Sequence, residues 1–145
     1  MTPSRARVAV LLVLASVGST ASGDEWKAPD AERARSNPVA PTPKALQKGR
    51  ALYQKHCATC HGDKGLGDGA AAAFNAGKPP SLADPKRLLS LTDGEMLWKI
   101  TTGRKEEDEV LMPAMAEKIP AEEDRWKLVS FVRTLAAKAE GAAAR

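Results

Sequence analysis

One five-residue run, Cys57-Ala58-Thr59-Cys60-His61, constrains this chain more than any other feature. It holds both cysteines of the 145-residue chain and one of its two histidines. Two thiols separated by two residues can reach the same edge of a porphyrin, and each can add to a vinyl group to form a thioether. His61 follows at once and can offer a neutral ring nitrogen to the iron. The run therefore predicts a covalently attached c-type haem, bound through Cys57 and Cys60 and ligated by His61.

Two other interpretations of this motif are weaker. A redox-active Cys-x-x-Cys pair is typical of a βαβ setting, but no strand-like run of Val and Ile occurs after residue 17. A structural zinc site needs four ligands, commonly from two separated pairs. All cysteines and histidines of this chain lie within residues 56–61, where neighbours do not easily form a tetrahedron. Haem attachment is the interpretation that the spacing favours.

Residues 1–23 have the composition of a secretory signal peptide. A basic start with two arginines is followed by an apolar run over residues 8–17 and then by small residues. Cleavage after Ala21 and cleavage after Gly23 both fit the pattern. The apolar run is shorter than the roughly 20 residues of a membrane-spanning helix, so an uncleaved anchor is the minor alternative. We therefore expect a periplasmic protein, because haem thioethers are formed outside the bacterial cytoplasm.

The rest of the chain predicts one small domain with loose ends. Residues 24–42 are polar, charged and proline-bearing without a clear period, and we expect a flexible leader there. Residues 43–138 are the predicted domain, and residues 139–145 a frayed tail. The net charge of +4 falls once the arginines of the signal peptide are removed, and no basic cluster alternates with stacking aromatic residues. We therefore expect no nucleic-acid partner.

Cap residues and apolar periodicity within the domain predict an all-α fold of about four helices. Thr42 with Pro43 fits a helix start, and Thr92 with Glu95 forms a capping box. Gly103 would end the helix that this box begins. The predicted helices cover residues 42–55, 92–103 and 121–138, with a helical turn at 70–75 and an extended proline segment at 78–82.

Gly49 lies inside the first predicted helix, where glycine costs about 1 kcal/mol relative to alanine. A second helix that crosses closely at this point would explain the glycine, with Tyr53 packed one turn further along. Tolerance of glycine near a helix start is the alternative.

Met112 is the predicted second ligand of the haem iron. It lies in a loop that reads Leu111-Met112-Pro113-Ala114-Met115. A thioether is a soft ligand that favours ferrous iron and raises the reduction potential. Pro113 stiffens the backbone beside Met112, which favours Met112 over Met115, the alternative ligand in the same loop. Packing in the core is the other role open to any single methionine.

The segment from about residue 37 to residue 135 resembles a bacterial mono-haem class I cytochrome c. The haem motif and Met112-Pro113-Ala114 are the specific parts, and residues 49–53, 98–103 and 126–133 match less specifically. The resemblance implies an all-α cytochrome c fold of about four helices around one haem c, with terminal helices that cross near Gly49 and Phe131. It also implies that a carbonyl of Pro79-Pro80 accepts a hydrogen bond from the His61 ring.

This resemblance implies a one-electron carrier, rather than an enzyme, that meets redox partner proteins. Two alternatives stay open: a haem subunit of a larger oxidase or reductase complex, and a haem enzyme or gas sensor with a labile sixth ligand. The acidic residues 106–109 are expected to form a solvated loop. Six basic residues either surround the haem edge and steer an acidic partner or are merely solvated: Lys55, Lys64, Lys78, Lys99, Arg104 and Lys105.

Overall fold

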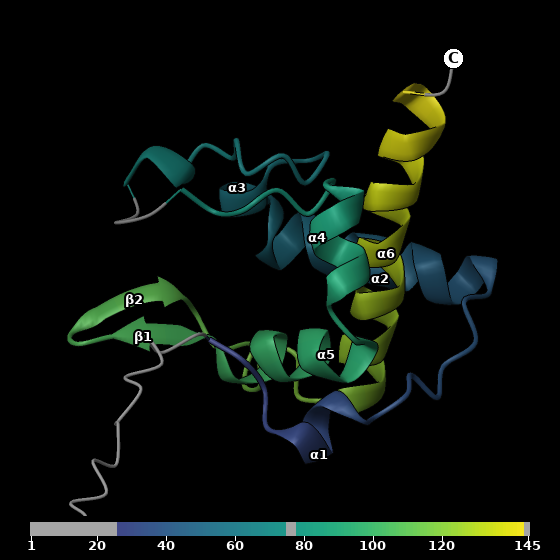
Figure 1. The fold of residues 1–145 in the computed structure, drawn as a ribbon, viewed down its shortest axis with the longest axis horizontal. Helices are drawn as coiled ribbons and strands as arrows, with labels where there is room; N and C mark the ends of the chain where they lie inside the picture. The colour runs from purple at the N-terminus through teal and green to yellow at the C-terminus, as the bar shows by residue number, and fades with distance from the viewer. Residues whose placement is uncertain (1–25, 75–77, 144–145) are drawn as a thin grey trace, which may run out of the picture.

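The computed structural model in Figure 1 describes residues 26–74 and 78–143, which leaves the predicted signal peptide outside the described residues. Within these ranges the chain forms six α-helices, one short 3-10 turn and a two-stranded sheet. The predicted all-α class is confirmed, with the small sheet as an addition. The elements in chain order are α1 (Asp30–Arg33), α2 (Pro43–His56), α3 (Ala58–His61), η1 (Ala72–Phe74), α4 (Pro85–Ser90), α5 (Asp93–Thr102), β1 (Arg104–Glu106), β2 (Glu109–Met112) and α6 (Glu122–Ala143).

The crossing of α2 and α6 is the centre of the fold (Figure 1). The Thr42 hydroxyl accepts a hydrogen bond from the backbone N–H of Ala45 at 3.2 Å and so caps α2 as predicted. A Cβ atom on Gly49 would lie 2.2 Å from the carbonyl oxygen of Lys127 and 2.9 Å from Cβ of Phe131. The two backbones therefore meet at Gly49, which confirms the predicted close crossing.

The hydrophobic core lies between these two helices and the helices α4 and α5. Its most deeply buried side chains have less than 2 % of their surface exposed, and each contributes about 1.5–3 kcal/mol by burial. Tyr53 and Phe131 meet within it with ring centroids 5.3 Å apart. The most buried residues are Tyr53, Leu88, Leu97, Leu128 and Val129.

Helices α4 and α5 are started by capping side chains and are fastened to α6 by one arginine. The Thr92 hydroxyl accepts from the N–H of Glu95 at 3.1 Å, as the predicted capping box requires. The helix α4 was not predicted; the Asp84 carboxylate caps it by accepting from the N–H of Lys86 at 3.0 Å. Arg133 of α6 donates to Asp93 at 2.8 Å and to a backbone carbonyl between the two helices. The α4–α5 turn is thereby fixed on α6.

The segment after α5 forms an antiparallel hairpin. Residues 106–109 are exposed, as expected for a solvated segment, but they form the end of this hairpin and not an irregular loop. Arg104 in β1 lies opposite Met112 in β2, and the register is irregular between Arg104 and Lys105. The exposed turn at the end of the hairpin carries Glu107 with a φ of 50°. The backbone pairing, which does not depend on apolar alternation, explains why charged residues form these strands.

Residues 26–42 are packed on the domain, whereas the sequence predicted a flexible leader. Ala28 is 4 % exposed, and the Asn37 side chain donates to the Trp126 carbonyl at 3.1 Å. The Thr92 hydroxyl donates to the Arg33 carbonyl at 2.8 Å. The polar residues that indicated flexibility therefore make specific hydrogen bonds with α5 and α6.

The last helix continues to Ala143, into the segment for which a frayed tail was predicted. Alanine is the strongest helix former, and it supports these last turns beyond Lys138. In the part of the chain that the structure describes, no helix is both long and apolar enough to cross a membrane.

Candidate haem site

The three predicted haem-binding residues of the motif share one helical turn. The carbonyl of Cys57 accepts from the N–H of Cys60 at 3.1 Å and from the N–H of His61 at 2.9 Å. Residues three and four apart on a helix lie on the same face. The backbone therefore presents both thiols and the imidazole to one side of α3.

The loop after α3 closes back onto the same turn. The backbone N–H groups of Gly67 and Gly69 donate to the carbonyls of His61 and Cys60 at 2.8 and 3.1 Å. These bonds satisfy carbonyls that the short helix leaves without partners of its own. The motif is thus held by its own neighbours in the sequence.

Tyr53 fixes the residue that follows His61. Its hydroxyl is fully buried and donates to the carbonyl of Gly62 at 2.7 Å. Burial raises the pKa of Tyr53, so the side chain stays a neutral hydrogen-bond donor. The sequence placed Tyr53 in the helix packing, but nothing in the sequence indicated this bond.

The environment of His61 keeps its imidazole neutral. Burial lowers the pKa of His61, and the charge of Arg87 lowers it further. The Pro80 carbonyl has the opposite effect and raises the pKa of His61. The Nδ1 atom of His61 is buried, and its contact with this carbonyl does not have the geometry of a normal hydrogen bond. The Pro80 carbonyl is thus near the imidazole, in the stretch implied by the resemblance. A neutral ring is the form that ligates iron.

Both cysteines of the motif are partly buried, and the Cys57 thiol is a weak acid. Burial raises the pKa of Cys57 to about 12, with a further contribution from Cys60. A thiol that stays protonated is a poor nucleophile, which disfavours the redox-dithiol interpretation. Among the residues described, no three His, Cys, Asp or Glu side chains come together as metal ligands, so the zinc interpretation gains no support.

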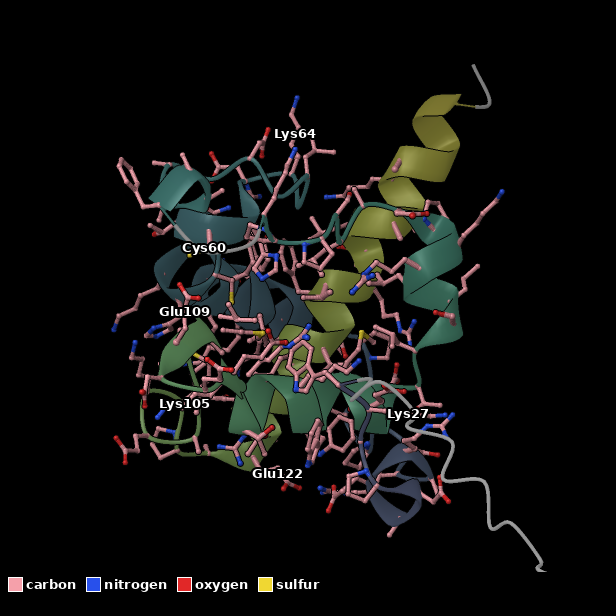
Figure 2. The ribbon with its side chains drawn as sticks, turned by 60° about the vertical axis from the view of Figure 1, so that its left-hand side comes forward. Lys27, Cys60, Lys64, Lys105, Glu109 and Glu122 are labelled. Atoms are coloured by element: carbon pink, nitrogen blue, oxygen red, sulfur yellow. The ribbon has the colours of Figure 1, made fainter. Side chains whose placement is uncertain are left out.

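Met112 ends β2 at the edge of the core. Its side chain is partly buried and packs against the same hydrophobic cluster as Cys57. Met115 instead lies inside that cluster with 4 % exposure, and its N–H donates to the carbonyl of Ile100 at 3.0 Å. Figure 2 shows Cys60 of α3 above Glu109 of β2, and Figure 1 places α3 and the hairpin on that same side of α6. Helix α3 and the hairpin that ends at Met112 therefore lie on one side of α6.

Two of the six basic residues expected to surround the haem edge are engaged within the protein. The ammonium group of Lys99 lies 2.9 Å from the Glu95 carboxylate and 4.9 Å from the ring centroid of Trp26. The guanidinium of Arg104 pairs with Glu106 and lies 5.6 Å from the same ring. These two cations therefore contribute little to the steering of a partner. Sequence analysis missed Trp26 because its contacts lie far away in the chain.

The residues present fit a covalently attached haem c. Two thiols and a neutral imidazole occupy one face of a single turn. The Pro80 carbonyl near the His61 ring is the kind of acceptor that orients a metal-ligating histidine through its other nitrogen. Met112 adds a soft donor of the kind that pairs with histidine in electron-transfer haems. Met112 as the sixth ligand stays a prediction.

Comparisons with known proteins support a c-type cytochrome domain with covalently bound haem c. A family model described as "Cytochrome C oxidase, cbb3-type, subunit III" matches residues 44–132, more than half of the chain. No curated protein matches the chain. Among solved structures, a chain of the reducing HAO-like protein complex of Kuenenia stuttgartiensis is similar, with 26 % identity and a TM-score of 0.56. The likeness covers 68 % of this chain and 46 % of that one, so this chain spans less than half of the length of its structural relative.

Proposed function

Because the chain belongs to the c-type cytochrome family described as cytochrome c oxidase, cbb3-type, subunit III, we propose that it is a periplasmic one-electron carrier. Haem c on Cys57 and Cys60 supplies a reversible ferric–ferrous couple, with His61 and Met112 as the axial ligands. The observation that carries the proposal is the packing of Cys57 and Met112, distant in sequence, against the same core cluster.

The chain's own residues prepare the site for electron transfer. Burial keeps His61 neutral and ready to ligate, and the turn of α3 fixes its direction. The pairing of β1 with β2 holds the backbone of Met112. Ligands that are held in place in both oxidation states move little, and a small rearrangement favours rapid electron transfer.

A carrier differs from a haem enzyme or a gas sensor in its sixth ligand. A bound Met112 thioether would leave no position for an exogenous molecule, whereas an enzyme or sensor needs one. The partial burial of Met112 at the core edge, against the deep burial of Met115, supports Met112 as that ligand.

Carbon monoxide binding to the reduced holoprotein tests this proposal. We expect no binding in the wild type, ready binding in Met112→Ala, and no binding in the matched variant Met115→Leu. Ready binding in the wild type would favour the enzyme or sensor. Binding in Met115→Leu with none in Met112→Ala would move the ligand to Met115.

A subunit role in a larger redox complex is the second candidate. The similar structure is a chain of a protein complex, and this chain spans only 46 % of its length. Size-exclusion chromatography of the protein from its native cells distinguishes the two: a carrier elutes as a single small chain, and a subunit co-purifies with fixed partners.

Mass spectrometry of the same material checks export, with cleavage after Ala21 or Gly23 as the expected result.

A further inference from the structure

The packed segment over residues 26–42, here called the N-terminal strap, joins two distant parts of the domain. In Figure 1 it starts beside the hairpin, runs along α5 to α1 and continues to the start of α2. Its far part is anchored on α6, where Arg35 pairs with Glu122 and lies 5.3 Å from the ring centroid of Trp126. Its first part is anchored by Trp26 at the end of α5.

Trp26 makes three contacts at that end. Its indole Nε1 donates to the carbonyl of Gly103 at 3.2 Å. The cations of Lys99 and Arg104 lie 4.9 and 5.6 Å from its ring centroid, within the range of a cation–π interaction. The indole therefore binds the last turn of α5 and the first residue of β1 together.

The residues that Trp26 binds are also those that support the backbone of Met112. Gly103 has a φ of 67°, and a Cβ atom there would lie 2.4 Å from the carbonyl oxygen of Met112 and 2.6 Å from the nitrogen of Ala114. Arg104 is the β1 residue that lies opposite Met112 in the hairpin. One indole thus contacts both neighbours of the Met112 backbone.

We propose that Trp26 is a positioning residue that holds the Met112 loop, residues 111–115, closed over the haem site, an inference that rests on the proposed His61–Met112 ligation. A folded segment opens transiently, and its open population depends on the contacts that hold it closed. Trp26 supplies such contacts through Gly103, which lies 77 positions away in the chain. Without them, Met112 leaves the iron more often.

Imidazole binding to the ferric holoprotein measures this opening, because imidazole takes the position that Met112 vacates. We expect Trp26→Ala to bind imidazole about tenfold more tightly than the wild type, as a corresponding rise in the open population requires. Trp26→Phe keeps a ring over Lys99 and Arg104 but lacks the donor to Gly103, and an intermediate increase of about threefold follows.

Arg35→Gln is the matched control, because it loosens the strap at α6 without touching Gly103 or Arg104. It should leave the imidazole affinity unchanged, and urea unfolding of each variant shows that the proteins are folded. Wild-type affinity in both Trp26 variants would overturn the inference, as would an equal increase in Arg35→Gln. A wild type without thioether ligation in its ferric spectrum would instead refute the proposed function on which the inference rests.

Discussion

The two sides of the haem site are built in different ways. On the α3 side, the bonds that hold Cys60 and His61 come from within a few residues, namely from Cys57, Gly67 and Gly69. On the hairpin side, the backbone of Met112 pairs with nearby Arg104 but also packs against Gly103, which is bound by Trp26 from 77 positions away. A ligand held by its own helical turn forms with that turn, whereas a ligand held by distant contacts depends on the whole fold. We therefore expect the hairpin side to open first.

The largest effect should come from the α2–α6 crossing, which both sides share. Gly49→Ala places a methyl group 2.2 Å from the Lys127 carbonyl and should lower the free energy of unfolding by about 3 kcal/mol, because the two backbones must separate. Gly141→Ala, with no atom within 4 Å of the new methyl group, should instead stabilise α6 by up to about 1 kcal/mol. Urea unfolding measures both. Equal effects of the two substitutions would show that α2 and α6 do not meet at Gly49.

A smaller effect is expected on the α3 side alone. Tyr53→Phe removes the donor to the buried Gly62 carbonyl and should cost about 1–2 kcal/mol of unfolding free energy. The affinity for imidazole should stay at the wild-type value, because Met112 is not involved. A large gain in that affinity would mean that the two sides are coupled more tightly than their contacts indicate.

A change at the start of α5, where the strap contacts it, should be of about the same size or smaller. Thr92→Ser keeps the cap of α5, whereas Thr92→Ala removes both the cap on Glu95 and the bond to the Arg33 carbonyl. We expect Thr92→Ala to cost about 1 kcal/mol and Thr92→Ser much less, as measured by thermal unfolding. If the two variants were equally unstable, loss of the Thr92 methyl group would explain the effect, and the hydroxyl contacts with the strap would have no part in it.

The smallest expected effect is a pH dependence of the strap. The Arg35 guanidinium lowers the pKa of Glu122 below its usual range. The ion pair therefore stabilises the fold fully at a pH above the unfolded-state pKa of about 4.3. This stabilisation is lost as the pH falls through the lower pKa of Glu122 in the folded protein. Because the pair is largely exposed, we expect only a few tenths of a kcal/mol. Arg35→Gln should remove this part of the pH dependence in urea unfolding between about pH 6 and about pH 3. An identical profile in the variant would exclude the ion pair as its cause.

The parts of the fold that the sequence predicted are those whose cause is local. The caps at Thr42 and Thr92 act within three residues of themselves, and the haem motif specifies its own turn. Gly49 is an informative exception, because its cost inside a helix indicated a distant partner that the structure places at Lys127. The assignment of Met112 as the sixth ligand remains a prediction.

The parts that the sequence did not predict depend on contacts between distant residues. The strap looked flexible because its polar residues have no period, yet Asn37 finds its acceptors on α6. The hairpin lacks apolar alternation and is defined by the pairing of Arg104 with Met112. The helix α4 carried a readable signal, since Asp84 precedes Pro85 and caps the next turn.

The absorption spectrum of the oxidised wild-type holoprotein tests the central claim most directly, namely that His61 of α3 and Met112 of the hairpin ligate one haem from its two faces. The account predicts a low-spin spectrum with a weak thioether–iron charge-transfer band at the red end of the visible range. A high-spin spectrum, or a low-spin spectrum without that band, would contradict it.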